Sequence, residues 1–128
     1  MIELKGIWRS YMIFCYSGKV RHNNSSFYIE IEIDNEGQFY LRHCRNISSY
    51  LKWNAGQWSI EKFKERSFLC VKRKRIFEII TIEEKELVLL DLTNDEKIFM
   101  VPYQNWSDRI RLISRAIGYI KPPISETL

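Results

Sequence analysis

The stretch Phe27-Tyr28-Ile29-Glu30-Ile31-Glu32-Ile33-Asp34 (FYIEIEID, residues 27–34) decides the fold class of this chain. Its apolar and polar residues alternate strictly, with Phe27, Ile29, Ile31 and Ile33 at the apolar positions. Successive side chains of a β-strand point to opposite faces, so the stretch predicts a strand with one buried and one solvent-facing side. The turn residues Asn35-Glu36-Gly37 follow, and residues 38–45 are again rich in β-formers. The two segments therefore predict a tight antiparallel hairpin.

Short β-segments separated by turns continue on both sides of this hairpin. Upstream, residues 7–16 predict a long first strand that ends at Ser17-Gly18. Downstream, the predicted strands cover residues 50–53, 57–63, 67–72, 75–82, 86–92 and 97–101, so that all strands lie within residues 6–101. Strands at a spacing of about 8 to 12 residues, without helices between them, are typical of an antiparallel meander that closes into a barrel or folds into a sandwich. A parallel α/β fold is excluded.

After Pro102 the apolar period changes from two residues to between three and four. One stripe contains Trp106, Ile110, Ile113, Ile117 and Ile120. This spacing predicts an amphipathic helix over about residues 105–120, which the prolines of the C-terminal tail, residues 121–128, bring to an end. The apolar stripe has to be covered, and we expect it to pack on the outside of the sheet or across one end of a barrel. A helix that binds a partner or a membrane surface is the alternative.

Length and composition indicate one globular domain. The chain has 128 residues, of which 45% are hydrophobic and 28% charged, and we expect a single domain over residues 1–128. Lys and Arg number 20 against 16 Asp and Glu, so the net charge of +4 favours anionic partners without requiring them. Cys15, Cys44 and Cys70 form no C-x-x-C pair, which predicts reduced thiols.

The N-terminal residues predict no export signal. Residues 1–6 do not begin an apolar run of seven or more, as a signal peptide would. We therefore expect a cytoplasmic protein without a transmembrane segment. A location in the cell envelope would be expected instead if an export signal had been removed from the chain.

Two short motifs resemble the lipocalin-like (calycin) architecture, in its small bacterial type. Gly6-Ile7-Trp8 matches the G-x-W that opens lipocalin barrels, and Gly56-Gln57-Trp58-Ser59-Ile60 is similar to a strand of small bacterial lipocalin-like domains. The resemblance implies an up-and-down antiparallel β-barrel of about eight strands with one C-terminal amphipathic α-helix. It also implies that Trp8 closes the floor of the barrel under a basic side chain, for which Arg109 and Arg111 are the candidates.

If the barrel closes, the strand period assigns an inward-facing set of side chains. These are Trp8, Ser10, Met12 and Phe14 in the first strand and Phe27, Ile29, Ile31 and Ile33 in the second. An eight-stranded barrel can be packed solid or can hold one small ligand. Our leading hypothesis is a non-enzymatic protein that binds a small hydrophobic or amphipathic ligand in its interior, with Ser10, Tyr16 or Tyr28 orienting the ligand near the mouth. The alternative is a protein-protein interaction module with a filled core, which acts through its outer face, its helix or a homodimer.

A basic segment offers a further candidate site. Residues 72–74 fall where a hairpin tip is expected, and together Lys72, Arg73, Lys74 and Arg75 would form a basic rim for an anionic head group. The longer basic run also includes Lys62, Lys64 and Arg66, and its interleaved Phe63, Phe68 and Phe77 would suit single-stranded nucleic acid, whose bases stack on exposed rings. However, these rings fall at strand positions that we expect to be buried, so nucleic-acid binding is the third hypothesis.

The sequence predicts no metal site, no cofactor and no catalytic centre. His43 and Cys44 are adjacent in a predicted strand and therefore point to opposite faces. Glu30, Glu32 and Asp34 share the face of their strand that we expect to be exposed to solvent. No grouping of Ser, His and Asp and no glycine-rich phosphate loop is evident.

Overall fold

The computed structural model describes residues 4–23, 27–46 and 49–116, with the side chains of 44–55 and 114–116 excepted. Nine strands are assigned in this part of the chain: β1 (Gly6–Phe14), β2 (Val20–His22), β3 (Tyr28–Ile33), β4 (Gln38–Asn46), β5 (Ser49–Phe63), β6 (Arg66–Val71), β7 (Lys74–Glu83), β8 (Glu86–Asp91) and β9 (Glu96–Pro102). A 3-10 turn, η1 (Tyr103–Asn105), and one helix, α1 (Trp106–Ala116), follow.

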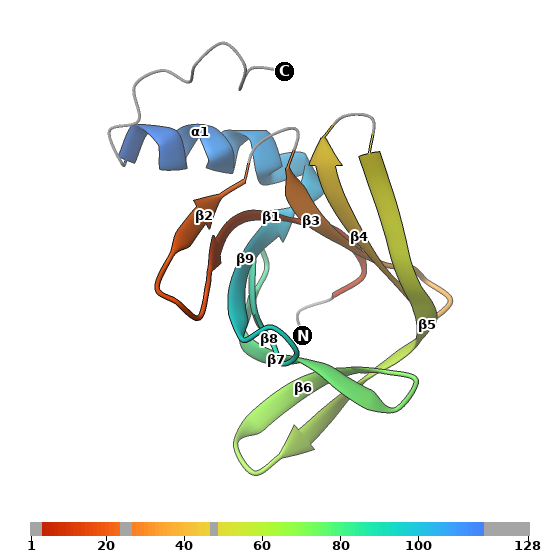
Figure 1. Cartoon of the computed structure of the whole chain (residues 1–128). Helices are drawn as coiled ribbons and strands as arrows, with labels where there is room; N and C mark the ends of the chain where they lie inside the picture. The colour runs from red at the N-terminus through yellow and green to blue at the C-terminus, as the bar shows by residue number, and fades with distance from the viewer. Residues whose placement is uncertain (1–3, 24–26, 47–48, 117–128) are drawn as a thin grey trace.

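The strands form a closed antiparallel barrel with eight strand positions (Figure 1). From β3 to β9 each strand pairs with the next, and β9 pairs back onto β1. The other edge of β1 is shared, because β2 pairs with residues 12–14 and β3 pairs with residues 6–9. The prediction of a mainly β, up-and-down barrel with one C-terminal helix is therefore confirmed, and the sandwich is excluded. The predicted hairpin is β3 and β4, and the two strands predicted at 50–53 and 57–63 are the single long strand β5.

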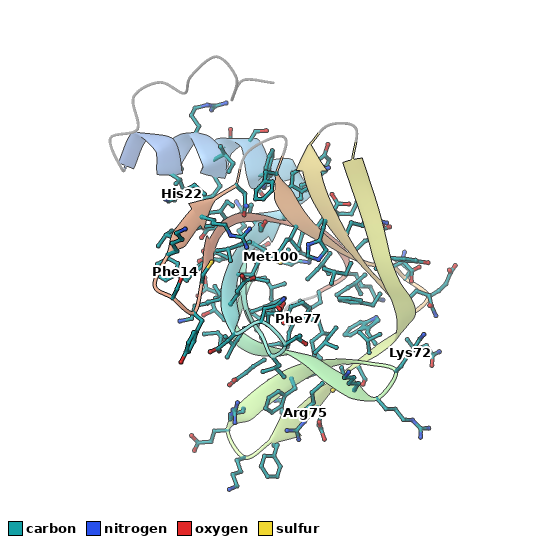
Figure 2. All side chains as sticks on the ribbon, viewed as in Figure 1. Phe14, His22, Lys72, Arg75, Phe77 and Met100 are labelled. Carbon is teal, nitrogen blue, oxygen red and sulfur yellow. The ribbon has the colours of Figure 1, made fainter. Side chains whose placement is uncertain are left out.

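A β-bulge at Tyr11 changes which residues of β1 point inward. Ser10 pairs with Met100 and Met12 with Phe99, so one additional residue lies in β1 between these two pairs. An extra residue inverts the alternation of faces beyond it. The inward positions of Met12 and Phe14 were therefore predicted wrongly: Met12 packs on the outside with Phe99, Phe14 is 43% exposed, and Ile13 is buried in the core instead. Figure 2 shows Phe14 on the outside of the barrel and Met100 within it.

Apolar side chains fill most of the barrel. The buried cluster comprises Leu4, Trp8, Ile13, Ile29, Ile31, Ile33, Phe39, Leu41, Leu69, Val71, Phe77, Leu87, Leu89, Ile98 and Met100. Ile29, Ile31 and Ile33 thus lie where the sequence pattern placed them, whereas Phe27 precedes β3 and is 37% exposed. Because these side chains fill the middle of the barrel, we expect a ligand to fit only near one of its ends.

Trp8 lies in the barrel core, but neither Arg109 nor Arg111 lies over it as the resemblance implied. The Trp8 indole is 3% exposed and donates a hydrogen bond to the Leu4 carbonyl at 2.9 Å. Arg109 instead lies over the Tyr11 ring, 5.0 Å from its centroid, and Arg111 pairs with Asp108 at 3.2 Å. Both arginines belong to α1, which packs on the outer surface.

Helix α1 crosses the outside of the barrel over β1 (Figure 1). The indole of Trp106 donates a hydrogen bond to the Ser10 carbonyl at 2.6 Å and meets the Tyr28 ring edge-on at 5.2 Å. Ile110 and Ile113 pack in the same outer cluster, which is centred on Tyr11, Val101 and Trp106. The predicted packing helix is confirmed over Trp106–Ala116, whereas Ile117, Ile120 and the tail 121–128 lie outside the described residues.

An arginine surrounded by aromatic rings joins the helix to the barrel. The Arg9 guanidinium carbon lies 4.3 Å from the Tyr28 ring centroid, 4.0 Å from that of Tyr103 and 5.5 Å from that of Trp106. Its Nε donates to Glu30 at 2.6 Å, and the carboxylate of Glu30 also binds Arg42 at 2.6 Å. Glu30 was predicted to face solvent, but these arginines cover it and leave it 4% exposed.

Replacing Trp106 tests this attachment of the helix. Trp106→Ala removes a buried indole together with its hydrogen bond, and we expect a loss of about 3–5 kcal/mol in the free energy of unfolding. Leu112→Ala, at a position of the same helix that is 56% exposed, is the matched control and should change stability by less than about 0.5 kcal/mol. Urea denaturation of the two variants measures both values, and equal effects would contradict the attachment described above.

Candidate functional site

A pocket of about 330 Å³ lies at the end of the barrel that holds the β1–β2 and β8–β9 turns. Its lining consists of Ile13, Arg21, Asn23, Phe27, Tyr28, Ile29, His43, Asp91, Asn94 and Glu96. The edge of β1 is shared here, because β2 pairs with residues 12–14 and β3 with residues 6–9, and Asn23 and Phe27 of the lining lie next to these two strands. We call this feature the mouth pocket. Its volume is at the lower end of the range for small-molecule sites.

Apolar side chains from the core form one side of the mouth pocket. Ile13 is 1% exposed and Ile29 is 8% exposed, and both belong to the buried cluster that fills the barrel. Phe27 contributes a partly exposed ring at the rim. Ile13 reaches this position because of the bulge at Tyr11, which turns it inward.

The predicted site residues divide between three places. Phe27 and Ile29 line the mouth pocket, Trp8, Ser10 and Ile31 lie in the packed interior, and Met12 and Phe14 lie outside. Ser10 does not orient a ligand, because its hydroxyl accepts the Ile29 N–H at 2.8 Å and is fully buried. Tyr16 is 83% exposed in the β1–β2 turn, and Tyr28 lines the pocket while its ring packs against Trp106.

Sequence reasoning missed Ile13, Asn23 and His43 as pocket residues. His43 pairs with Ile29 across β3 and β4, so both side chains share the inner face of the barrel. The hairpin pattern of residues 27–45 contained this signal. By contrast, no local signal marks Asn23, whose place depends on the bulge in a neighbouring strand.

The charged groups at the mouth pocket are mostly engaged with one another. Arg21 pairs with Glu96 at 3.4 Å. Asp91 accepts hydrogen bonds from the backbone N–H groups of Thr93 and Asn94, at 2.9 and 3.2 Å, and from the Asn94 side chain at 3.2 Å. One arginine thus faces two carboxylates in this lining, which favours a neutral or cationic ligand over an anionic one.

The side-chain amide of Asn23 has no hydrogen-bond partner among the residues that the structure describes. Asn23 is 2% exposed, and its backbone N–H donates to the Tyr11 carbonyl at 3.0 Å. Within this part of the chain, neither Oδ1 nor Nδ2 forms a hydrogen bond. Each buried polar group left unpaired costs about 1–3 kcal/mol, so this amide destabilises the ligand-free protein. A group retained at such a cost is a candidate for ligand recognition.

The predicted basic rim does not border the pockets of this structure. Lys72 and Arg73 form the tip of the β6–β7 turn, with backbone φ angles of 55° and 69°. Lys74 and Arg75 begin β7, and none of the four residues lines the mouth pocket or the second pocket described below. Figure 2 shows Lys72 and Arg75 on the β6–β7 part of the barrel, away from Phe14 and His22 at the other side.

Of the three rings that were expected to be buried, Phe68 and Phe77 are, whereas Phe63 at the end of β5 is 50% exposed. Phe68 is 2% exposed, with Arg66 at 5.0 Å and Arg75 at 4.2 Å from its ring centroid. Arg66 forms two hydrogen bonds to Glu78, at 2.8 and 3.1 Å, and lowers the pKa of that carboxyl. Arg75 likewise binds Glu61 at 2.6 Å and lowers its pKa. These two arginines therefore each have a carboxylate partner, and both remain partly exposed.

A second pocket, of about 570 Å³, lies beside the β5–β6 turn. Its lining consists of Ile60, Lys62, Glu65, Arg66, Ser67, Glu78, Ile79, Ile80 and Ile82. Ile60 is 42% exposed and Ile80 is 43% exposed, which is unusual for isoleucines in strands. We call this feature the isoleucine groove.

Tyr11, whose pKa is strongly raised, lies beneath the helix. The hydroxyl of Tyr11 donates a hydrogen bond to the Glu86 carboxylate, and Tyr11 is 3% exposed. Burial, and then the neighbouring Glu86, raise the pKa of Tyr11 well above its usual range. This group therefore serves the packing of the outer cluster, away from the mouth pocket. Among the described residues, no three His, Cys, Asp or Glu side chains are grouped as metal ligands would be.

The raised pKa of Tyr11 predicts a loss of stability at alkaline pH. The folded-state pKa exceeds the value of about 10 in the unfolded chain, so the stabilisation is complete below pH 10 and is lost as the pH rises toward the folded pKa. At pH 11 ionisation of the unfolded tyrosine alone should favour unfolding by about 1.4 kcal/mol. Urea denaturation at pH 8 and pH 11 should show a smaller decrease for Tyr11→Phe than for the parent protein. Equal decreases would show that Tyr11 titrates normally.

Comparisons with known proteins give no indication of function, so the proposals below rest on the geometry of the pockets. No protein-family model, no curated protein and no solved structure matches the chain. Within the described residues, no helix is both long and apolar enough to cross a membrane.

Proposed function

We propose that this protein is a non-enzymatic, calycin-like binding protein that holds one small amphipathic molecule in the mouth pocket. The carrying observation is the pocket of about 330 Å³ whose lining includes the core residues Ile13 and Ile29. The closed eight-stranded barrel with a C-terminal helix is compatible with a calycin-like fold.

The packed interior supports a small ligand near the surface. Phe39, Leu89 and Met100 are fully buried in the middle of the barrel and leave little space between them. A ligand therefore binds at the mouth and contacts Ile13, Ile29 and Phe27 with its apolar part. Its polar part faces Asn23 and the turn that carries Asp91 and Asn94.

Binding without catalysis is proposed because the polar groups of the pocket hold one another. Arg21 is paired with Glu96, and Asp91 is occupied by three hydrogen bonds of its own turn. Groups fixed in this way can orient a ligand, whereas general acid-base catalysis needs a group that is available to the substrate.

We also propose a cytoplasmic location. Cys15 and Cys70 are free thiols in the structure, which supports a reducing compartment. Labelling of intact and lysed cells with an impermeant thiol reagent would test this, since Cys15 is partly exposed. Labelling in intact cells would contradict the proposed location.

Blocking the mouth pocket tests the function. Asn94→Trp places a large side chain in the lining, and we expect it to weaken binding of the neutral fluorophore N-phenyl-1-naphthylamine at least about tenfold. Thr93→Trp adds the same side chain to the neighbouring turn position, which does not line the pocket, and should change the affinity by less than about twofold. Fluorescence titration measures both. Absence of saturable binding to the parent protein, or equal effects of the two variants, would contradict the proposal.

Self-association through the isoleucine groove is a second candidate function. The exposed Ile60 and Ile80 favour it, since apolar groups in such a groove gain from being covered. Lys62 and Arg66 in its lining are balanced by Glu65 and Glu78. A surface with balanced charges can pair with a second copy of itself around a two-fold axis.

A charge placed in the groove tests the second candidate. Ile60→Asp should convert a dimer to a monomer in sedimentation-velocity experiments over a range of protein concentrations. Leu92→Asp, at a residue that is 39% exposed in the β8–β9 turn and lies outside the groove, is the matched control and should leave the dimer intact. A parent protein that is monomeric at every concentration would exclude this function.

A further inference from the structure

We propose that the side-chain amide of Asn23 recognises an amide-like edge of the ligand, a hydrogen-bond donor and an acceptor placed side by side on an uncharged group. This inference rests on the function proposed above and specifies the class of ligand that the mouth pocket takes. It follows from the position of Asn23, from its lack of partners and from the charges around it.

The backbone of Asn23 is held in place while its side chain is not engaged. The N–H of Asn23 donates to the carbonyl of Tyr11, the bulged residue of β1. Asn23 lines the mouth pocket and is 2% exposed. Among the described residues, its Oδ1 and Nδ2 atoms have no hydrogen-bond partner. At the protein surface, water would form hydrogen bonds to such an amide. In a ligand site, the amide stays unpaired until the ligand binds.

The chemistry of a carboxamide defines the complementary group. Oδ1 accepts a hydrogen bond and Nδ2 donates one, and the two atoms lie on the same edge of a planar group. A primary carboxamide, a lactam or a ring N–H beside a C=O presents the reverse pair with the same spacing. A ligand of this class satisfies both atoms of Asn23, whereas a carboxylate or an ammonium group satisfies one of them.

The charges of the mouth pocket disfavour a carboxylate, which has the same shape as a carboxamide but is anionic. Arg21 is already paired with Glu96, and Asp91 keeps its carboxylate at the rim. A carboxylate ligand would therefore face like charge at Asp91 and would compete with Glu96 for Arg21. The uncharged amide edge avoids this repulsion.

The amide becomes available to a ligand by rotation of one side chain. Both polar atoms are closed off from solvent in the ligand-free protein, so contact requires a turn about the side-chain torsions of Asn23 toward the pocket. The apolar neighbours Ile13, Ile29 and Phe27 then receive the remainder of the ligand. A single aromatic ring that carries a carboxamide suits this combination of surfaces.

Four probes that share a phenyl ring test the inference. Benzamide offers a donor and an acceptor, N,N-dimethylbenzamide an acceptor alone, benzoate an anion and benzamidine a cation with donors alone. Titrations followed by two-dimensional NMR of the full chain should give benzamide an affinity at least about tenfold above that of each other probe. The side-chain NH2 signals of Asn23 should shift most with benzamide. The same affinity for benzamide and N,N-dimethylbenzamide would overturn the inference.

Asn23→Leu separates recognition from folding. Leucine has a similar size and removes both unpaired polar atoms, so we expect this variant to melt at or above the temperature of the parent protein. It should lose the preference for benzamide while still binding the phenyl probes through Ile13 and Ile29. Thr93→Leu, in the β8–β9 turn and outside the pocket lining, is the control and should keep the preference.

The outcomes distinguish this inference from the function on which it rests. Binding of the probes at the Ile13 and Ile29 methyl groups with no preference for benzamide, or with a preference that survives Asn23→Leu, overturns the role of Asn23 and leaves a small-molecule site in place. Absence of any shift at these methyl groups overturns both. A benzamide preference that Asn23→Leu abolishes supports the inference.

Discussion

The extra residue at Tyr11 in β1 is the constraint on which the rest of the structure depends. The register of β1 against β9 shifts at this point, and every side chain beyond it exchanges faces. Tyr11 itself turns outward beneath the helix, Ile13 turns into the barrel, and Phe14 turns out to solvent. The Tyr11 carbonyl also holds the N–H of Asn23. One local irregularity therefore creates both the seat of the helix and one wall of the mouth pocket.

The two ends of the barrel have different relations to its packed middle. Trp8 and Leu4 are buried in the core, and the Trp8 indole donates to the Leu4 carbonyl. Toward the β8–β9 turn, the core residues Ile13 and Ile29 line the mouth pocket. Toward the β5–β6 turn, Ile79 and Ile82 pack against the core and line the isoleucine groove.

Four described arginines each bind a carboxylate and an aromatic ring at once. Arg9 and Arg42 enclose the buried carboxylate of Glu30, Arg9 also supports the rings of Tyr28, Tyr103 and Trp106, and Arg42 lies near the ring of Tyr40. Arg66 and Arg75 cover Phe68 and pair with Glu78 and Glu61. Guanidinium groups suit these positions because they stack on rings and bind carboxylates at once.

The sequence by itself determined most of the strands, the β3–β4 hairpin and the amphipathic helix, because alternation and helical spacing are local properties that adjacent residues express directly. It did not indicate β2, and it divided β5 into two strands. It also placed Ile29, Ile31 and Ile33 in the core. The tertiary structure alone decided that Met12 and Phe14 lie outside, since a bulge depends on pairing with a distant strand and leaves no mark in the period of the strand that carries it. For the same reason Asn23 and His43 join one pocket only when the barrel closes, as each reaches it from a different strand or strand end. Local patterns specify elements, whereas a site assembled from several elements requires their register in space.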